Sequence, residues 1–341
     1  MGAAMTRLAL IGCGKDTPHC ISASRRLFDA RVVAVVDADV GRASHVARHI
    51  DAPLVKTSLE HLLAGHGDEF DAVVIQADCA EHASLAVAAA RGGKHVLVDS
   101  PLALTVESAD MAIAACDAAG GRLMVGQSLR FAPAQQTLKE RLSSGKLGTP
   151  GLLRIHRWEP LASGDGWQSG LDVLREGTPF LARAIPAIDL ANWLFETRPT
   201  HVYAVGCKQS SGELESPDYF QIHLGFPEGG MVLIDEARTL PRGDAYFSLS
   251  VIGSMGAAYA DDHHNMNLLY RGGAPAALNA NHGDLHVLSQ LEEFTRAITE
   301  AREPVIGGAD GRAAIEVAIA AAESMQSGRS AVLSGDNYEL S

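Results

Sequence analysis

Residues 7–17 read R-L-A-L-I-G-C-G-K-D-T, an apolar strand that runs directly into a glycine-rich turn. Gly12 and Gly14 carry no Cβ, so the turn can bend tightly and its backbone can approach a bulky ligand closely. A helix is expected at about residues 21–28, and the free N–H groups at a helix start can bind phosphate. Such a strand–turn–helix unit is typical of a domain that binds dinucleotides.

The alternation of strands and helices continues to about residue 125. The run R-V-V-A-V-V-D at 31–37 is rich in β-branched residues, as expected for a strand that is buried on both faces of a parallel sheet. Because each crossover helix must cover a sheet face, residues 1–126 are predicted to form a Rossmann-type, doubly wound parallel sheet. Further strands are expected at 54–55, 72–76, 95–99 and 123–125, and helices at 42–49, 58–66 (capped by Ser58), 80–91 and 106–119 (capped by Thr105).

Residues 127–341 follow a different pattern. A helix at 133–142 and a strand at 151–158 precede a loop rich in Gly, Ser and Asp at 160–177, which is a candidate lid. Consecutive strands joined by short turns predict an α+β domain with one large, open, mostly antiparallel sheet and helices on one face. The expected helices lie at 179–195, 285–300 and 309–326, and the expected strands at 200–207, 219–226, 231–237, 246–252, 257–260 and 267–270.

Composition excludes several classes of function. The formal net charge of −13 argues against a nucleic-acid or anionic-membrane partner, and no apolar run approaches the roughly 20 residues of a membrane helix. Five scattered cysteines without a C-x-x-C pair fit the reducing cytoplasm and no structural zinc. The run D-D-H-H-N at 261–265 could ligate a metal only on paper, because adjacent side chains point apart. A solvated loop is the better interpretation, and no metal is expected.

Asp37 ends the second predicted strand, where a carboxylate would accept hydrogen bonds from the adenosine ribose diol. The same charge would repel a 2′-phosphate, so NAD is favoured over NADP. Thr17 stands at the third glycine position and Pro18 follows it, so the alternative is a dinucleotide fold that has lost its ligand. The candidate cofactor-binding residues are Gly12, Gly14, Lys15, Asp16, Thr17, Asp37, Ala77, His82, Asp99 and Ser100.

Several motifs together resemble the glucose–fructose oxidoreductase/inositol dehydrogenase/rhizopine-catabolism (Gfo/Idh/MocA) family. They are Gly12-x-Gly14, Asp37, D-A-V-V-I-Q (71–76), His82, G-K-H-V-L-V-D-S-P (93–101), R-F-x-P (130–133) and G-K-L-G (145–148). The resemblance covers nearly the whole chain. It implies an NAD(P)-dependent oxidoreductase of sugars, inositols or related polyols, and a homo-oligomer, a dimer or tetramer, formed through the open sheet.

The catalytic positions implied by the resemblance are replaced. The family pattern Glu-Lys-Pro is Asp99-Ser100-Pro101 here, so Ser100 stands where the lysine would work near the nicotinamide. The family's Asp-x-Gly-x-His-x-x-Asp helix, aligned on Asp189, places Ala182 and Pro186 at the acid–base Asp and His positions. A serine hydroxyl has no charge with which to stabilise an alkoxide, and Ala and Pro cannot move a proton.

Two interpretations follow. In the first, the chain is a redox enzyme that uses other groups, with Arg183, His156 and Arg130 as candidates. Arginine could hold an anionic or carbonyl substrate, although its pKa makes it a poor base. In the second, the fold has been reused as a non-redox enzyme, an NAD-binding protein or a partner subunit. The candidate substrate-binding residues are Arg130, Arg157, Arg183, Asp189 and Trp167, around a site between the two domains.

Overall fold

The computed structural model describes residues 5–14, 17–160, 180–208, 217–240, 246–261, 267–270, 276–278, 285–334 and 337–340. These residues form two compact units. The first unit contains the described residues up to Ser128 and also Leu285–Ile315 from the end of the chain. The second unit begins at Leu129 and takes up the chain again from Glu316.

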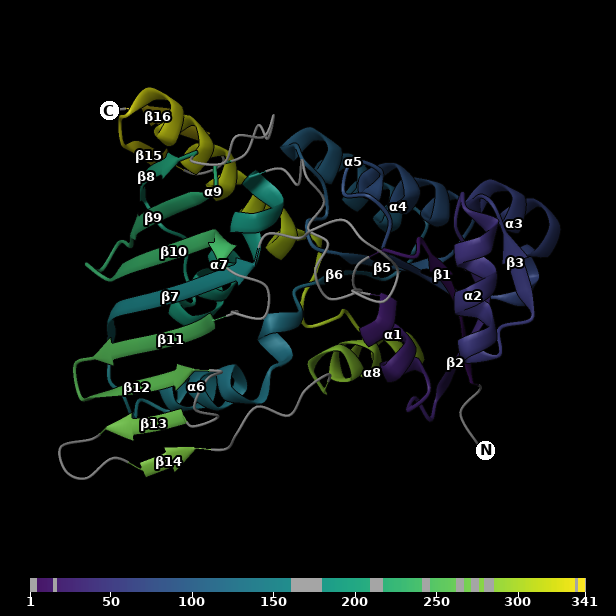
Figure 1. Cartoon of the computed structure of the whole chain (residues 1–341), viewed down its shortest axis with the longest axis horizontal. Helices are drawn as coiled ribbons and strands as arrows, with labels where there is room; N and C mark the ends of the chain where they lie inside the picture. Colours follow the sequence, from purple (N-terminus) through teal and green to yellow (C-terminus); the bar gives the residue numbers. More distant parts are fainter. Residues whose placement is uncertain are drawn as a thin grey trace. The chain divides into compact units, whose positions relative to one another are not determined.

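The first unit is built on a six-stranded parallel sheet, as the sequence predicts, and its strand order is β3-β2-β1-β4-β5-β6. Helix α1 packs against α2 and α8, whereas α4 packs against α3 and α5, so helices cover both faces (Figure 1). The strands are β1 (Thr6–Ile11), β2 (Ala30–Val36), β3 (Leu54–Lys56), β4 (Ala72–Ile75), β5 (His95–Asp99) and β6 (Leu123–Gly126). The helices are α1 (Thr17–Ser24), α2 (Val40–Ile50), α3 (Leu59–His66), η1 (Gly67–Glu69), α4 (His82–Arg91), α5 (Val106–Ala118) and α8 (Leu285–Thr299).

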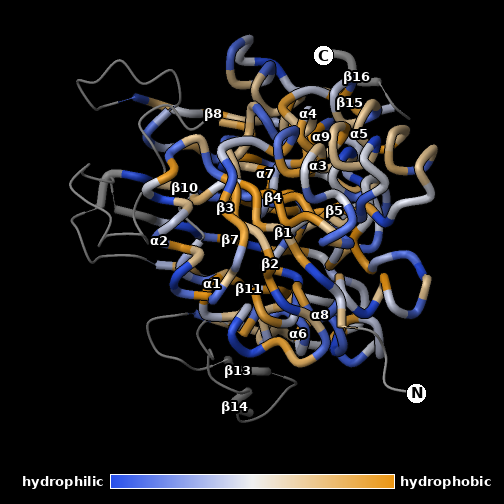
Figure 2. The backbone as a smooth tube through the Cα atoms, turned by 90° about the vertical axis from the view of Figure 1, so that its right-hand side faces the viewer, coloured by the Kyte–Doolittle hydropathy of each residue, from blue (hydrophilic) through white to orange (hydrophobic). Residues whose placement is uncertain are grey.

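Buried aliphatic strands form the core of this unit. Ala9, Val35, Val73 and Val98, on four neighbouring strands, are fully buried. Figure 2 shows the hydrophobic residues concentrated along β1, β2 and β4. Because both faces of a parallel sheet are covered, its strands are continuous apolar runs rather than alternating ones.

Local signals set most helix starts. Ser58 and Thr105 cap α3 and α5 as predicted, and each side-chain oxygen accepts a hydrogen bond from a backbone N–H three residues on. The predicted start of α1 at residue 21 is wrong, because α1 begins at Thr17. Pro18 lies in its first turn, where proline costs no hydrogen bond and its fixed φ suits the helix.

The second unit contains a ten-stranded sheet in the order β14-β13-β12-β11-β7-β10-β9-β8-β15-β16. The central pair β7 and β10 is parallel, and the other strand pairs with a described register in this sheet are antiparallel. The strands are β7 (Pro150–Pro160), β8 (His201–Cys207), β9 (Tyr219–Gly225), β10 (Met231–Leu240), β11 (Tyr246–Gly253), β12 (Gly256–Asp261), β13 (Asn267–Tyr270), β14 (Ala276–Leu278), β15 (Ala331–Ser334) and β16 (Asn337–Leu340). The remaining helices are η2 (Ser128–Phe131), α6 (Pro133–Ser143), α7 (Phe180–Phe195) and α9 (Gly308–Ser327).

The two faces of this sheet differ in burial. Ile155, Ile222 and Ile234 are fully buried on the face against which α7 packs. Successive side chains along a strand point to opposite faces, and on the other face Tyr203 on β8 is 40% exposed and Met231 on β10 is 57% exposed. The prediction of a mostly antiparallel sheet with helices on one face is confirmed, although β14, β15 and β16 escape the sequence pattern. Among the described helices, none combines the length and the apolar character that crossing a membrane requires.

Candidate functional site

The glycine turn lies directly against the end of β4. Gly12 has a φ of +88°, and its N–H donates to Val36 O at 2.7 Å. A Cβ on Gly12 would lie 2.5 Å from Ala77 N, and one on Gly14 would lie 2.7 Å from Gln76 O. Only glycine fits both positions, so the backbone geometry suits a turn that carries a pyrophosphate. Lys15 and Asp16, two predicted cofactor contacts, lie outside the described residues.

The Asp37 side chain is hydrogen-bonded to this turn. Its Oδ2 accepts a hydrogen bond from Cys13 N at 2.8 Å, and its Oδ1 accepts from Asp39 N at 2.8 Å. Arg42 Nη2 donates to Oδ1 at 2.9 Å, and the Asp37 side chain is 8% exposed. Burial and the adjacent carboxylate raise the pKa of the Cys13 thiol to about 12, so this thiol is neutral. Asp37 therefore stands at the predicted ribose position, with part of its charge paired.

The carboxyl ends of β4 and β5 carry the other predicted contacts. The Ser100 N–H donates to Asp99 Oδ1 at 3.0 Å, and the buried Ser100 Oγ has no hydrogen-bond partner among the described residues. The His82 ring bridges two backbone segments, with Nδ1 2.7 Å from Pro101 O and Nε2 3.1 Å from Ala77 O. Burial lowers the pKa of His82, and the neutral ring, with a single N–H, donates to one of these two carbonyl oxygens at a time.

Two of the three arginine candidates of the second unit, Arg130 and Arg183, form buried ion pairs. Arg130 donates from Nε and Nη2 to the two oxygens of Asp189, at 2.7 and 2.6 Å. Arg183, 1% exposed, pairs with Glu236 at 2.7 Å, and its guanidinium carbon lies 4.9 Å from the centre of the Phe220 ring. Arg183 is adjacent to Ala182 on α7, and Pro186 lies inside that helix. The charges of Arg130 and Arg183 are therefore each held by a buried carboxylate.

His156 and Arg157 point to opposite faces of the large sheet, as their alternation along β7 predicts. Arg157 Nη1 donates to Arg183 O at 3.4 Å, on the face that α7 covers. His156 Nδ1 lies 3.1 Å from Asp235 Oδ2 on the other face, where its ring also contacts Trp158. His156 is therefore directed away from α7. Three predicted features lie outside the described residues: Trp167, residues 161–177 of the candidate lid at 160–177, and residues 262–265 of the predicted solvated loop.

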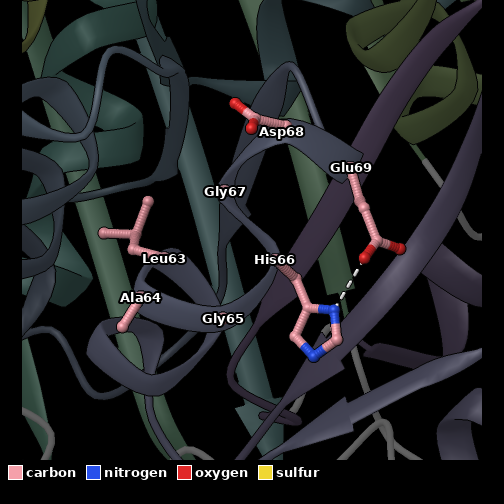
Figure 3. Close-up of a pocket in the computed structure, with 7 residues that line it drawn as sticks. All are labelled: Leu63, Ala64, Gly65, His66, Gly67, Asp68 and Glu69. Carbon is pink, nitrogen blue, oxygen red and sulfur yellow. Dashed lines mark hydrogen bonds and ion pairs between the residues drawn. The ribbon is translucent and has the colours of Figure 1, made fainter.

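A surface hollow lies at the opposite edge of the parallel sheet. It is lined by residues 63–69, at the end of α3 and along η1, just before β4 begins (Figure 3). His66 Nδ1 points to Glu69 Oε1 at 2.7 Å. Ligands of open α/β sheets bind outside the carboxyl ends of the strands, whereas this hollow lies beside an amino end. It is therefore separate from the candidate site.

Four residues near these sites are not among the predicted site residues. Arg42 and Glu236 pair with residues that were recognised, Asp37 and Arg183. Gln76 and Gln127 follow β4 and β6. The sequence does give a signal for Gln76 and Glu236, because each is a polar residue that ends or interrupts an apolar strand. Their partners could not be identified from that signal.

Two family models match the chain. One, described as an oxidoreductase family with an NAD-binding Rossmann fold, matches residues 6–127, and the GFO/IDH/MocA C-terminal domain matches residues 135–259. The chain is 25% identical over 337 residues to the myo-inositol 2-dehydrogenase of Thermotoga maritima, which covers 96% of this chain and 98% of that protein. It is 29% identical over 333 residues to the inositol 2-dehydrogenase of Acidothermus cellulolyticus, and the match covers 94% of this chain and 93% of that protein.

Solved structures share the fold. The WlbA dehydrogenase of Bordetella pertussis, solved with NADH and UDP-GlcNAcA, superimposes with a TM-score of 0.82 at 19% identity, over 98% of this chain and 99% of that chain. The aldose–aldose oxidoreductase of Caulobacter crescentus, solved with glycerol, gives a TM-score of 0.81 at 22% identity, over 96% of this chain and 100% of that chain. At these identities the likeness establishes the fold alone.

The buried pair of Arg183 and Glu236 should contribute to stability only as a pair. Replacing Arg183→Met leaves a buried, uncompensated carboxylate, so we expect the free energy of unfolding to fall by about 3–5 kcal/mol. The double replacement Arg183→Met with Glu236→Leu should recover most of that loss. Urea unfolding followed by tryptophan fluorescence measures both. The exposed Arg154→Met serves as the control, and a double variant no more stable than the single one would contradict the assignment.

Proposed function

The chain belongs to the Gfo/Idh/MocA family of oxidoreductases, and on that premise we propose that it binds NAD(H) and oxidises or reduces a sugar, a polyol or a related small molecule without using the family's lysine. The observation that carries this proposal is the glycine turn, closed against residues 76–77 with Asp37 fixed beside it. The residues that would hold the cofactor are Gly12, Gly14, Thr17, Asp37, Ala77, His82, Asp99 and Ser100, with Lys15 and Asp16.

The preference for NAD rests on Asp37. Its fixed carboxylate would accept hydrogen bonds from a ribose diol and would repel a 2′-phosphate. Arg42 offsets part of this negative charge from 2.9 Å away. We therefore propose NAD as the preferred cofactor, with a modest rather than an absolute preference over NADP.

The chemistry at the nicotinamide would differ from that implied by the family pattern. The bound nicotinamide would supply the hydride acceptor or donor. Ser100 can orient a polar group but carries no charge. Arg130 and Arg183 already hold Asp189 and Glu236, so we propose that they shape the substrate side of the site rather than transfer protons. Arg157, and Trp167 from the undescribed segment, remain proposed substrate contacts.

A second candidate function is a reused fold that binds NAD without hydride transfer. It is favoured by the same replacements, because Ser100, Ala182 and Pro186 offer no group that titrates near neutral pH. Such a protein would act as a non-redox enzyme or as the NAD-binding subunit of a larger assembly.

We also propose that the chain forms a homo-oligomer in the cytoplasm through the open face of its large sheet. Five large apolar or aromatic side chains on that face are 40–57% exposed in the single chain: Tyr203, Val205, Met231, Ile252 and Tyr259. Exposed apolar side chains on one sheet face support the burial of that face against a second copy of the chain.

Cofactor binding tests the proposal directly. We expect Gly14→Ala to weaken NADH binding at least about tenfold, since the new Cβ would lie 2.7 Å from Gln76 O and displace the turn. Isothermal titration calorimetry measures the Kd. Gly65→Ala is the matched control, because a Cβ there meets no atom within 4 Å. The proposal fails if the unaltered chain does not bind NADH, and equal affinities of the two variants would remove the turn from the site.

The paired charge of Asp37 predicts how cofactor preference responds to Arg42. We expect Arg42→Ala to raise the ratio of the NADPH Kd to the NADH Kd about two- to fivefold, because the carboxylate then faces a 2′-phosphate unshielded. Arg48→Ala, a change of the same size on the same helix, should leave the ratio unaltered. An unchanged or lower ratio in the Arg42 variant would refute this account of Asp37.

Turnover distinguishes the two candidate functions. Acid–base catalysis contributes about 10²–10⁴-fold, so a site without it should oxidise common inositols and polyols at well under about 0.1 s⁻¹. NADH formation followed at 340 nm over a panel of these substrates gives kcat. A kcat near 10 s⁻¹ that survives Ser100→Ala would show that another group transfers the proton. NADH binding with no turnover of any sugar, polyol or inositol would favour the reused fold.

A further inference from the structure

His82 is a buried histidine with a carbonyl oxygen beside each of its ring nitrogens. It is the first residue of α4 and is 2% exposed. The chain enters α4 through a turn in which Ala80 N donates to Asp78 Oδ1 at 3.0 Å and Glu81 N donates to Asp78 O at 2.8 Å. From the end of this turn the His82 ring reaches back to Ala77, the residue that precedes the turn.

The two carbonyl oxygens belong to segments that leave neighbouring strands. Ala77 O, 3.1 Å from Nε2, lies two residues beyond β4, and Pro101 O, 2.7 Å from Nδ1, lies two residues beyond β5. The two strands are parallel and paired, with Ile75 in register with Val98. One side chain therefore bridges two segments at the carboxyl edge of the sheet.

Both segments belong to the proposed cofactor site. Ala77 is the wall against which the glycine turn closes, because a Cβ on Gly12 would lie 2.5 Å from Ala77 N. Ser100 directly precedes Pro101 and stands where the family pattern has its lysine. A shift of either segment would therefore move a predicted contact of the dinucleotide.

The distances indicate which hydrogen bond the neutral ring makes. It has one N–H, and the shorter of the two contacts favours Nδ1 as the donor, to Pro101 O. The ring lies between the two segments in either tautomer. Because His82 is buried, an apolar side chain in its place would remove this hydrogen bond where water has little access to replace it.

We propose that His82 is a positioning residue, whose ring holds the segments after β4 and β5 in the arrangement that binds the cofactor. It would act before the cofactor arrives, so that binding does not have to order these segments. The apparent Kd rises in inverse proportion to the fraction of the chain in the binding arrangement, so a fraction of about a third to a tenth weakens binding about three- to tenfold. The inference rests on the proposed function, because its ligand is NADH, and it gives His82 an indirect role through the backbone of Ala77 and Pro101.

A pair of histidine variants separates positioning from stability. We expect His82→Leu to raise the NADH Kd about three- to tenfold, measured by isothermal titration calorimetry on folded protein. His95→Leu is the matched control, because His95 lies at the opposite end of β5 and its Nδ1 accepts a hydrogen bond from Arg122 N at 2.9 Å. Both variants lose a hydrogen bond between a histidine and the backbone and should unfold at lower urea concentration, but only His82→Leu should change the Kd.

Conservative variants test the assigned hydrogen bond. The amide NH₂ of asparagine can take the place of Nδ1, and that of glutamine can take the place of Nε2. We expect His82→Asn to bind NADH within about twofold of the unaltered chain, because it keeps a donor toward Pro101 O, and His82→Gln to recover less. A ring that acted only by filling space would favour the larger glutamine.

Amide hydrogen exchange follows the two segments without any ligand. In the cofactor-free chain, residues 76–81 and 99–104 should exchange faster in His82→Leu than in the unaltered chain, as mass spectrometry of peptides measures. His82→Asn should restore slow exchange at 99–104. His95→Leu should leave both segments unaltered.

Three results would overturn the inference while leaving the proposed function intact. They are an unchanged NADH Kd in His82→Leu, an equal loss in His95→Leu, and binding by His82→Asn that is no better than by His82→Leu. Unchanged exchange at both segments in His82→Leu would overturn it as well. If the unaltered chain does not bind NADH, the proposed function itself has failed, and this inference fails with it.

Discussion

The close contact between the Gly12–Gly14 turn and the backbone at Gln76–Ala77 is the constraint on which the first unit depends. No side chain fits between the two segments, so β1 and β4 can end at the same level only if the turn is made of glycine. Asp37 then reaches the turn through the Cys13 N–H, which ties the end of β2 to the same edge. The ends of β1, β2 and β4 are thus held together, and α1 begins at Thr17, shortly after the turn.

Much of this arrangement could be predicted because its causes are local. The β-branched run at 31–37, the caps Ser58 and Thr105, and the glycines each act within a few residues, and the structure confirms what they imply. The start of α1 was misjudged for an equally local reason. Thr17 and Pro18 interrupt the glycine pattern of a phosphate turn, but proline in the first turn of a helix helps to start that helix.

The second unit shows what a single sequence cannot supply. Its strands and turns were predictable from their spacing, whereas the partners of Arg130 and Arg183 lie 59 and 53 residues away. Arg183, beside a vacated catalytic position, is a candidate for the missing group on sequence alone. The structure buries it against Glu236 and Phe220, two contacts that no local pattern in the sequence indicates. The short strands β14, β15 and β16 are not among the predicted elements.

The residues at the expected catalytic positions are uncharged, which bears on proton transfer. Just after β4, β5 and β6, the buried groups without a hydrogen-bond partner among the described residues are an alcohol and two amides. Arg130 and Arg183 are each paired with a carboxylate. Oxidation of an alcohol releases a proton, and the group that accepts it must change its own charge. Ser100, Ala182 and Pro186 cannot do so near neutral pH. A substrate with its own acid or base beside the reacting carbon would bring that group with it. Within the proposed redox function, such a substrate would suit the site better than a plain polyol.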